Sequence, residues 1–145
     1  MDEKIGGPYL TAALICEKVL RETDGVLTPV RIIDKFFVNG STEQMQPVTL
    51  TFSILILLKA GDYRGRAAVA VHPTSPTGKE LQALTFSIHF EGDNDRGVAI
   101  IAPTGLQVDE EGLYWFDVKR DGQLVSRIPL RVVYQQITPL FAGTV

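Results

Sequence analysis

Two long alternating segments joined by a turn constrain the fold of this 145-residue chain more than any other feature. They span Glu110–Tyr134, and the Asp-Gly pair within Arg120-Asp121-Gly122 is typical of a β-hairpin. A two-residue turn would pair Val118 with Val125, whereas a three-residue loop pairs Val118 with Leu124. We predict the three-residue loop, because that register places one apolar set on a single face. This predicted inward set is Tyr114, Phe116, Val118, Leu124, Ile128 and Leu130.

The remainder of the chain continues the two-residue alternation that is typical of strands. The clearest case is Val48–Lys59, in which every second residue is apolar. The segment Tyr9–Glu22 is open to two interpretations. Thr11 could cap a helix, but the alternation of Leu10 to Cys16 and the following turn residues favour a strand. The predicted strands are 9–22, 26–38, 48–59, 66–71, 81–91, 97–102 and the two arms of the hairpin.

About eight strands separated by turn residues are typical of a sandwich or barrel. We predict an all-β antiparallel β-sandwich, immunoglobulin-like or C2-like. The segment Glu110-Glu111-Gly112-Leu113-Tyr114 resembles the Asp-x-Gly-x-Tyr tyrosine corner of immunoglobulin-like sandwiches, with Glu110 in place of Asp. It predicts a buried Tyr114 whose hydroxyl bonds to the backbone, with Trp115 on the opposite side of the sheet.

Size and composition indicate one soluble domain. We predict an N-terminal arm at 1–8, a single domain at 9–137 and a tail at 138–145, since domains commonly contain ~100–150 residues. The net charge is −3 and Lys and Arg are dispersed along the sequence, so we expect no nucleic-acid partner. The longest apolar run, Ile54–Leu58, is far shorter than a membrane helix requires, so no membrane partner is expected. One cysteine, Cys16, and no signal-peptide pattern favour the cytoplasm.

The residues that could bind a metal are scattered. Cys16, His72 and His89 fall on separate predicted strands without the close spacing of zinc ligands. The turn Glu91–Gly97 has alternating acidic residues, but Arg96 occupies the position where a calcium loop requires glycine. We therefore predict no metal site and no cofactor.

The residues that could perform catalysis are equally sparse. Ser87 and His89 lie two residues apart on one strand face, roughly 7 Å from each other, which is too far for a hydrogen bond. We predict no catalytic residues. The alternative function is ligand or metal binding, or hydrolysis, at the loops Pro73–Gly78 and Glu91–Gly97.

One acidic residue interrupts an apolar row. Asp34 shares a phase with Val30, Ile32, Phe36 and Val38. A carboxylate in such a row must be paired when buried, or a β-bulge must turn it outward. Both interpretations are structural and neither requires catalysis.

The outward face of the hairpin carries residue types that are enriched at interaction hot spots. In the predicted register Trp115 lies across from Arg127, close enough for a cation–π contact. Leu55, Leu57 and Phe37 would extend the apolar area. We predict a non-enzymatic protein-interaction module that self-associates, most simply as a two-fold homodimer; the alternative is that the chain's own arm or tail covers this face. The predicted interaction residues are Leu113, Trp115, Arg127, Pro129 and Arg131.

Several segments also resemble an uncharacterised bacterial family of short, β-rich proteins of unknown function. The resemblance covers most of the chain, supports a strand at Leu10–Leu20 and implies a bacterial origin, but implies no activity. The segments that carry it are Ile15–Leu20, Asp24–Leu27, Val30–Asp34, Gly112–Val118 and Arg127–Arg131.

Overall fold

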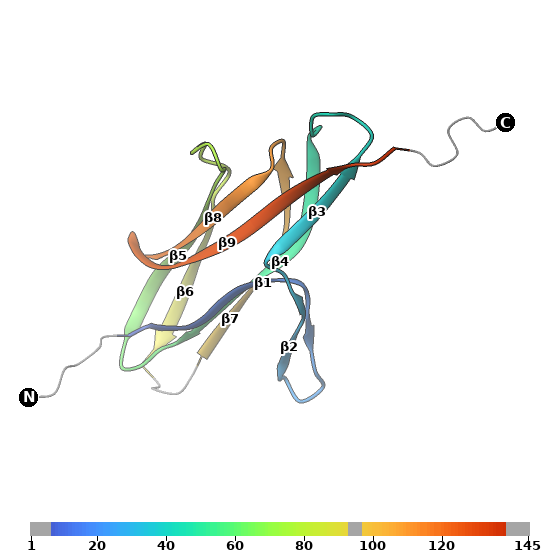
Figure 1. Ribbon diagram of the computed structural model, residues 1–145. Coiled ribbons are helices and arrows are strands. Elements are labelled where there is room, and N and C mark those ends of the chain that lie inside the picture. The colour runs from blue at the N-terminus through green and yellow to red at the C-terminus, as the bar shows by residue number, and fades with distance from the viewer. Residues whose placement is uncertain (1–6, 93–96, 139–145) are drawn as a thin grey trace, which may run out of the picture.

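The computed structural model describes residues 7–92 and 97–138, and these residues form nine strands and no helix (Figure 1). The predicted arm at 1–8 and tail at 138–145 therefore lie mostly outside the described residues. The strands are β1 (Tyr9–Arg21), β2 (Leu27–Ile32), β3 (Lys35–Gly40), β4 (Val48–Lys59), β5 (Arg64–Thr74), β6 (Leu84–Glu91), β7 (Gly97–Val108), β8 (Gly112–Arg120) and β9 (Gln123–Gln136).

Two sheets make up the sandwich. The four-stranded sheet has the order β2-β1-β4-β7 and the five-stranded sheet has the order β3-β9-β8-β5-β6. Every pairing is antiparallel except that of β3 with β9, which is parallel. The prediction of an all-β sandwich is confirmed, and the segment from Tyr9 to Arg21 is a strand.

The core lies between the two sheets and is built from alternate residues of β4, β5, β8 and β9. Phe52 of β4 meets Phe116 of β8 with ring centroids 5.8 Å apart and ring planes at 89°. Both rings are almost fully buried, and burial of one such side chain contributes about 1.5–3 kcal/mol. The alternation read from Val48–Lys59 is thus the alternation that fills the core.

The predicted strand 26–38 is in fact two strands that belong to different sheets. β2 ends at Ile32 and β3 begins at Lys35, so the chain crosses between the sheets at Ile33 and Asp34. The backbone N–H of Ile33 donates to the Ile15 carbonyl (2.8 Å), and the Asp34 carbonyl accepts from the Arg131 N–H (3.1 Å). Asp34 is exposed at this crossing, so the interpretation as a paired buried acid is wrong; the acid does turn outward, but at a crossing between sheets and not at the predicted β-bulge.

The hairpin between β8 and β9 has a different register from the predicted one. Arg120 pairs with Gln123, which leaves a two-residue turn at Asp121-Gly122 with φ of 48° and 82°. Positive φ at both residues is typical of a type I′ turn. The three-residue loop is therefore wrong. The turn is held against β5, because the Asp121 N–H donates to the Ala68 carbonyl (2.7 Å) and the Ala68 N–H donates to the Asp121 carboxylate (2.9 Å).

A β-bulge preserves the predicted burial of this hairpin despite the different turn. Lys119 pairs with Leu124 but Val118 pairs with Ser126, so Val125 is the extra residue. The bulge shifts the register by one residue and returns the inward set to one face. Tyr114, Phe116, Val118, Ile128 and Leu130 are buried as predicted. Leu124 is 49% exposed, and its predicted burial is wrong because it lies on the turn side of the bulge.

The tyrosine corner is present. The Tyr114 hydroxyl donates to the Glu110 carbonyl over 2.7 Å, and the side chain is 1% exposed. Trp115 is half-buried on the opposite side of the sheet, as predicted. Burial raises the pKa of Tyr114 to about 12, because the effect of burial is larger than the opposing effect of the hydrogen bond to Glu110.

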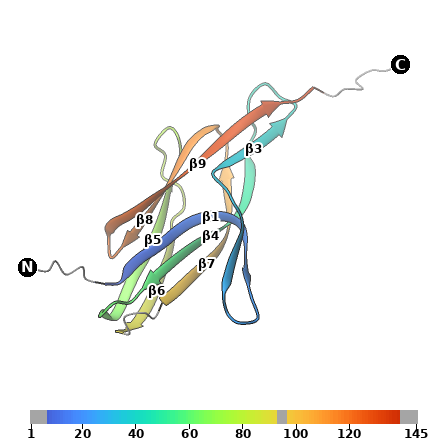
Figure 2. The same cartoon turned by 60° about the horizontal axis from the view of Figure 1, so that its bottom comes forward.

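A two-stranded projection, which we call the β1–β2 arm (residues 17–32), extends from the sandwich. β1 pairs with β4 only from Tyr9 to Cys16, whereas its later residues pair with β2. Both views show this hairpin diverging from the two sheets (Figures 1 and 2). Its turn is closed by the Glu22 N–H, which donates to the Val26 carbonyl (2.8 Å). Among the described residues, β4 at 48–52 consequently pairs with β7 alone.

Candidate functional site

The outer face of the five-stranded sheet holds the predicted interaction residues. Trp115 pairs with Pro129 and not with Arg127, which lies across from Asp117. Arg127 nevertheless reaches Trp115 diagonally, and its guanidinium carbon lies 4.5 Å from the ring centroid. The Arg127 Nε donates to the Asp117 carboxylate over 2.8 Å. The predicted cation–π contact is therefore present, and Asp117 fixes its geometry.

The proposed extension of this face is only partly right. Phe37 belongs to β3, pairs with Val133 and is 58% exposed, so it does extend the face. Leu55 and Leu57 lie in β4, which belongs to the other sheet. Leu55 is 2% exposed there and cannot contribute to the hairpin face. The sequence predicts correctly which residues point away from the core but not which of the two sheets presents them.

Basic residues gather on the same face. Strand alternation directs them away from the buried side chains of β3, β5, β8 and β9. At the outward strand positions that are described, the acidic residues of this face are Asp117 and Glu91, while Asp34 and Asp121 lie at the ends of its strands. The basic residues are Lys35, Arg64, Arg66, Lys119, Arg127 and Arg131, six of the 14 Lys and Arg in the chain.

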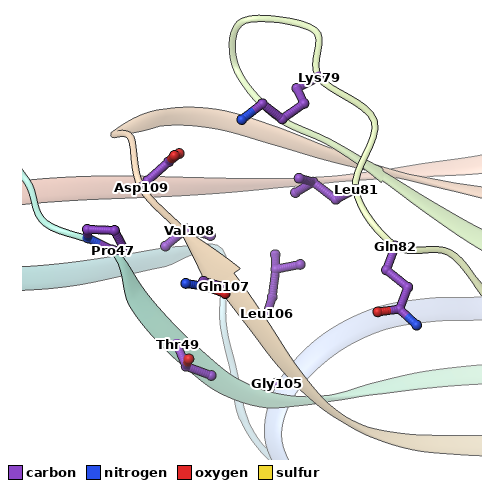
Figure 3. Close-up of a pocket in the computed structure, with 10 residues that line it drawn as sticks. All are labelled: Pro47, Thr49, Lys79, Leu81, Gln82, Gly105, Leu106, Gln107, Val108 and Asp109. Carbon is purple, nitrogen blue, oxygen red and sulfur yellow. The ribbon is translucent and has the colours of Figure 1, made fainter.

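A groove of about 510 Å³ lies between β7 and the segment that connects β5 to β6 (Figure 3). Leu81 and Leu106 lie on its two sides, while Lys79 and Asp109 lie toward the same end. The other lining residues are Pro47, Thr49, Gln82, Gly105, Gln107 and Val108. These ten residues include no His or Cys, so the groove offers polar and apolar binding contacts without a histidine or thiol for catalysis.

The end of the groove near Lys79 is held by hydrogen bonds. The Ser75 hydroxyl accepts from the Lys79 N–H (3.0 Å), and the Ser75 N–H donates to the Lys79 carbonyl (2.8 Å). The Glu110 carboxylate accepts from the Thr77 N–H (3.1 Å) and hydroxyl (3.0 Å). The loop at Pro73–Gly78, predicted as a candidate ligand loop, is thereby tied to the turn between β7 and β8. Its polar atoms support the fold.

The candidate metal ligands do not converge. Cys16 is buried in the four-stranded sheet, whereas His72 and His89 are exposed on β5 and β6 of the other sheet. Within residues 7–92 and 97–138, no group of three His, Cys, Asp or Glu could hold a metal ion. Burial raises the pKa of the Cys16 thiol, which disfavours the thiolate needed for a ligand or nucleophile.

The remaining candidate for catalysis lies at the end of β6. Ser87 accepts a hydrogen bond from Arg66 (3.3 Å), so its hydroxyl bonds to a cation and not to a base. A hollow of about 460 Å³ joins His89 to Glu91, with Arg64, Gly65 and Phe90 as its other lining. The calcium-loop hypothesis for Glu91–Gly97 depends on residues 93–96, which lie outside the described residues. No nucleophile and base are brought together among the residues that are described.

The two packed sheets and the tyrosine corner define the class: an all-β sandwich with an immunoglobulin-like tyrosine corner. Residues 11–133 match the family described as "Family of unknown function (DUF6941)", and the chain belongs to this family. The predicted resemblance to an uncharacterised β-rich family is confirmed. No protein of curated function matches the sequence significantly.

Similar folds occur in solved structures of low sequence identity. The CARDB domain of a Pyrococcus furiosus protein, solved in complex with di-metal ions, is 13% identical, with 90% of this chain and 95% of that chain covered and a TM-score of 0.43. The C-terminal domain of Wzt is 15% identical, with 91% and 77% covered and a TM-score of 0.46. At such identities the similarity concerns the fold alone.

Two features of the surface were missed by the sequence reasoning. The basic residues are dispersed along the sequence, and only the strand order brings six of them to one face. The groove beside β7 combines segments that are distant in the chain, so no local pattern indicates it. The sequence did contain one indication of the basic face, because the basic residues alternate with core positions along their strands and must therefore point away from the core.

The part of the chain that is described contains no helix long and apolar enough to cross a membrane.

Proposed function

We propose that this protein is a non-enzymatic interaction module of the bacterial cytoplasm that self-associates through the β1–β2 arm. The observation that carries the proposal is the exposure of apolar side chains on a projecting hairpin. Three of the six large hydrophobic residues that are exposed in the described chain lie on or at the tip of this arm: Leu20 (42%), Val26 (58%) and Ile32 (65%). The free, buried Cys16 is consistent with a reducing compartment.

The construction of the arm favours a second copy of the chain as its partner. Leu20 and Ile32 lie on one face of the arm, since Leu20 pairs with Thr28 and Cys16 pairs with Ile32. A two-stranded ribbon is marginally stable by itself, so contact with another surface would stabilise it. β4 at 48–52 offers an edge that the described part of its own chain leaves open on one side. Unpaired edges of this kind pair with other chains.

The β1–β2 arm is a different interface from the hairpin face predicted from the sequence. The hairpin face is part of the outer face of the five-stranded sheet, whose outward strand positions carry six cations and two carboxylates. Two-fold pairing of such a face would bring like charges together. The exposed apolar residues of the arm lack that penalty. On the arm, Arg31 forms an ion pair with Glu17 (3.5 Å), and the two charges offset one another.

Sedimentation velocity over a wide concentration range tests the proposal. Wild type should show a concentration-dependent dimer, and the double variant Leu20→Thr, Ile32→Thr should be a monomer, because it removes exposed apolar side chains from the arm. Threonine is chosen because it maintains strand propensity. Leu124→Thr is the matched control, because Leu124 is similarly exposed at the tip of the β8–β9 hairpin and should leave the dimer unchanged. Wild type that is monomeric at every concentration, or a dimer abolished by Trp115→Ala and not by the arm variant, would refute this interface.

A further inference from the structure

We infer that the outer face of the five-stranded sheet binds an acidic segment of a partner protein. The face gathers six of the 14 Lys and Arg of a chain whose net charge is −3. Outside this face the described residues include six Lys and Arg but eleven Asp and Glu, so positive charge is concentrated on the face. A surface of one sign on a protein of the opposite net sign selects partners by charge complementarity.

The centre of the face contains a preorganised aromatic and basic pair. Arg127 stacks on Trp115 at 4.5 Å and is held by Asp117 at 2.8 Å. The guanidinium is bound through its Nε, and its side chain remains 50% exposed. Because the stacking and the ion pair limit its rotamers, less side-chain entropy is lost when a partner binds there.

Two neighbouring cations, on β3 and β9, extend the basic surface beyond this pair. Lys35 on β3 and Arg131 on β9 are register partners on adjacent strands, whose backbones lie ~5 Å apart. Neither side chain has an ion-pair partner among the described residues. Phe37 and Pro129 follow on the same strands and add apolar contact area. An extended segment of alternating acidic and apolar residues would satisfy both kinds of contact.

The same features favour a polypeptide over a nucleic acid. Proteins that bind single strands stack bases on free aromatic rings, whereas Arg127 already occupies a face of Trp115. A protein partner uses exposed Trp and Arg as hot spots without that requirement.

Fluorescence anisotropy with a labelled deca-glutamate peptide tests the inference. Wild type should bind this peptide at low ionic strength, and the affinity should fall as salt is added. The double variant Lys35→Gln, Arg131→Gln should bind about tenfold more weakly, because two exposed charge contacts are lost. The matched control, Lys59→Gln with Lys79→Gln, removes the same charge from exposed positions off this face and outside the arm, and should retain binding.

Three outcomes would overturn the inference. Wild type that does not bind deca-glutamate at low ionic strength would exclude an acidic polypeptide. Equal weakening by the two double variants would show that net charge and not this face is responsible. Tighter binding of oligo-dT than of deca-glutamate would identify a nucleic-acid surface instead. The arm variant Leu20→Thr, Ile32→Thr should bind the peptide normally, so this result is independent of self-association.

Discussion

Replacing Tyr114 with Phe tests the tyrosine corner, which connects β8 to the turn after β7. The side chain is 1% exposed and its hydroxyl donates to the Glu110 carbonyl over 2.7 Å. A buried hydrogen bond of this kind contributes about 1 kcal/mol, and leaving the carbonyl without its donor adds a desolvation penalty. We therefore expect Tyr114→Phe to lower the free energy of unfolding by about 1–2 kcal/mol, without change of fold.

Equilibrium unfolding in urea, followed by Trp115 fluorescence, measures this difference. Tyr63→Phe is the matched control, because the Tyr63 hydroxyl also donates to a backbone carbonyl, that of Arg66 at 2.6 Å, but at an exposed site. Water can replace that bond, so the control should change stability by less than about 0.5 kcal/mol. Equal losses for the two variants, or a neutral Tyr114→Phe, would refute the assigned role of the corner.

The titration of Tyr114 provides a second measurement of the same environment. Burial raises its pKa from 10.0 to about 12, so the folded state holds the phenol proton more tightly than the unfolded state does. The shift therefore leaves the free energy of unfolding unchanged below pH 10 and lowers it by up to about 3 kcal/mol as the pH rises through 12. The wild type should lose more stability than Tyr114→Phe across this interval. Parallel stability–pH curves would contradict the shift.

Three further predictions concern single residues. Gly112→Ala should destabilise by about 1–3 kcal/mol in thermal unfolding, since φ is +133° and an added Cβ would lie 2.8 Å from Pro76; an unchanged midpoint would contradict this. Asp121→Ala should cost about 1–2 kcal/mol in urea, because the Ala68 N–H loses its acceptor and φ is positive, whereas Asp121→Asn should retain most of the stability. Cys16 should resist alkylation at pH 8 in the native state and react in denaturant, because it is fully buried with a raised pKa; rapid native labelling would refute this.

The sequence by itself determined most of the residues that face the core. Alternation in Val48–Lys59 and in Tyr114–Val118 has a period of two, and strand geometry converts that period directly into an inner and an outer face. The tyrosine corner was also readable, because Tyr114 bonds to the carbonyl of Glu110, only four residues earlier in the chain. Local spacing is sufficient for such features, since the atoms involved are neighbours in the chain.

Only the tertiary structure decided how the faces are aligned and combined. A two-residue turn followed by a bulge at Val125 buries nearly the same residues as a three-residue loop without a bulge. The burial pattern in the sequence therefore could not distinguish these two arrangements. The crossing at Ile33 and Asp34 divides one apparent strand between two sheets, because the Ile33 N–H donates to Ile15 in one sheet and the Asp34 carbonyl accepts from Arg131 in the other. The basic face follows from the same cause: strand order, which depends on contacts between distant segments, determines which outward residues become neighbours.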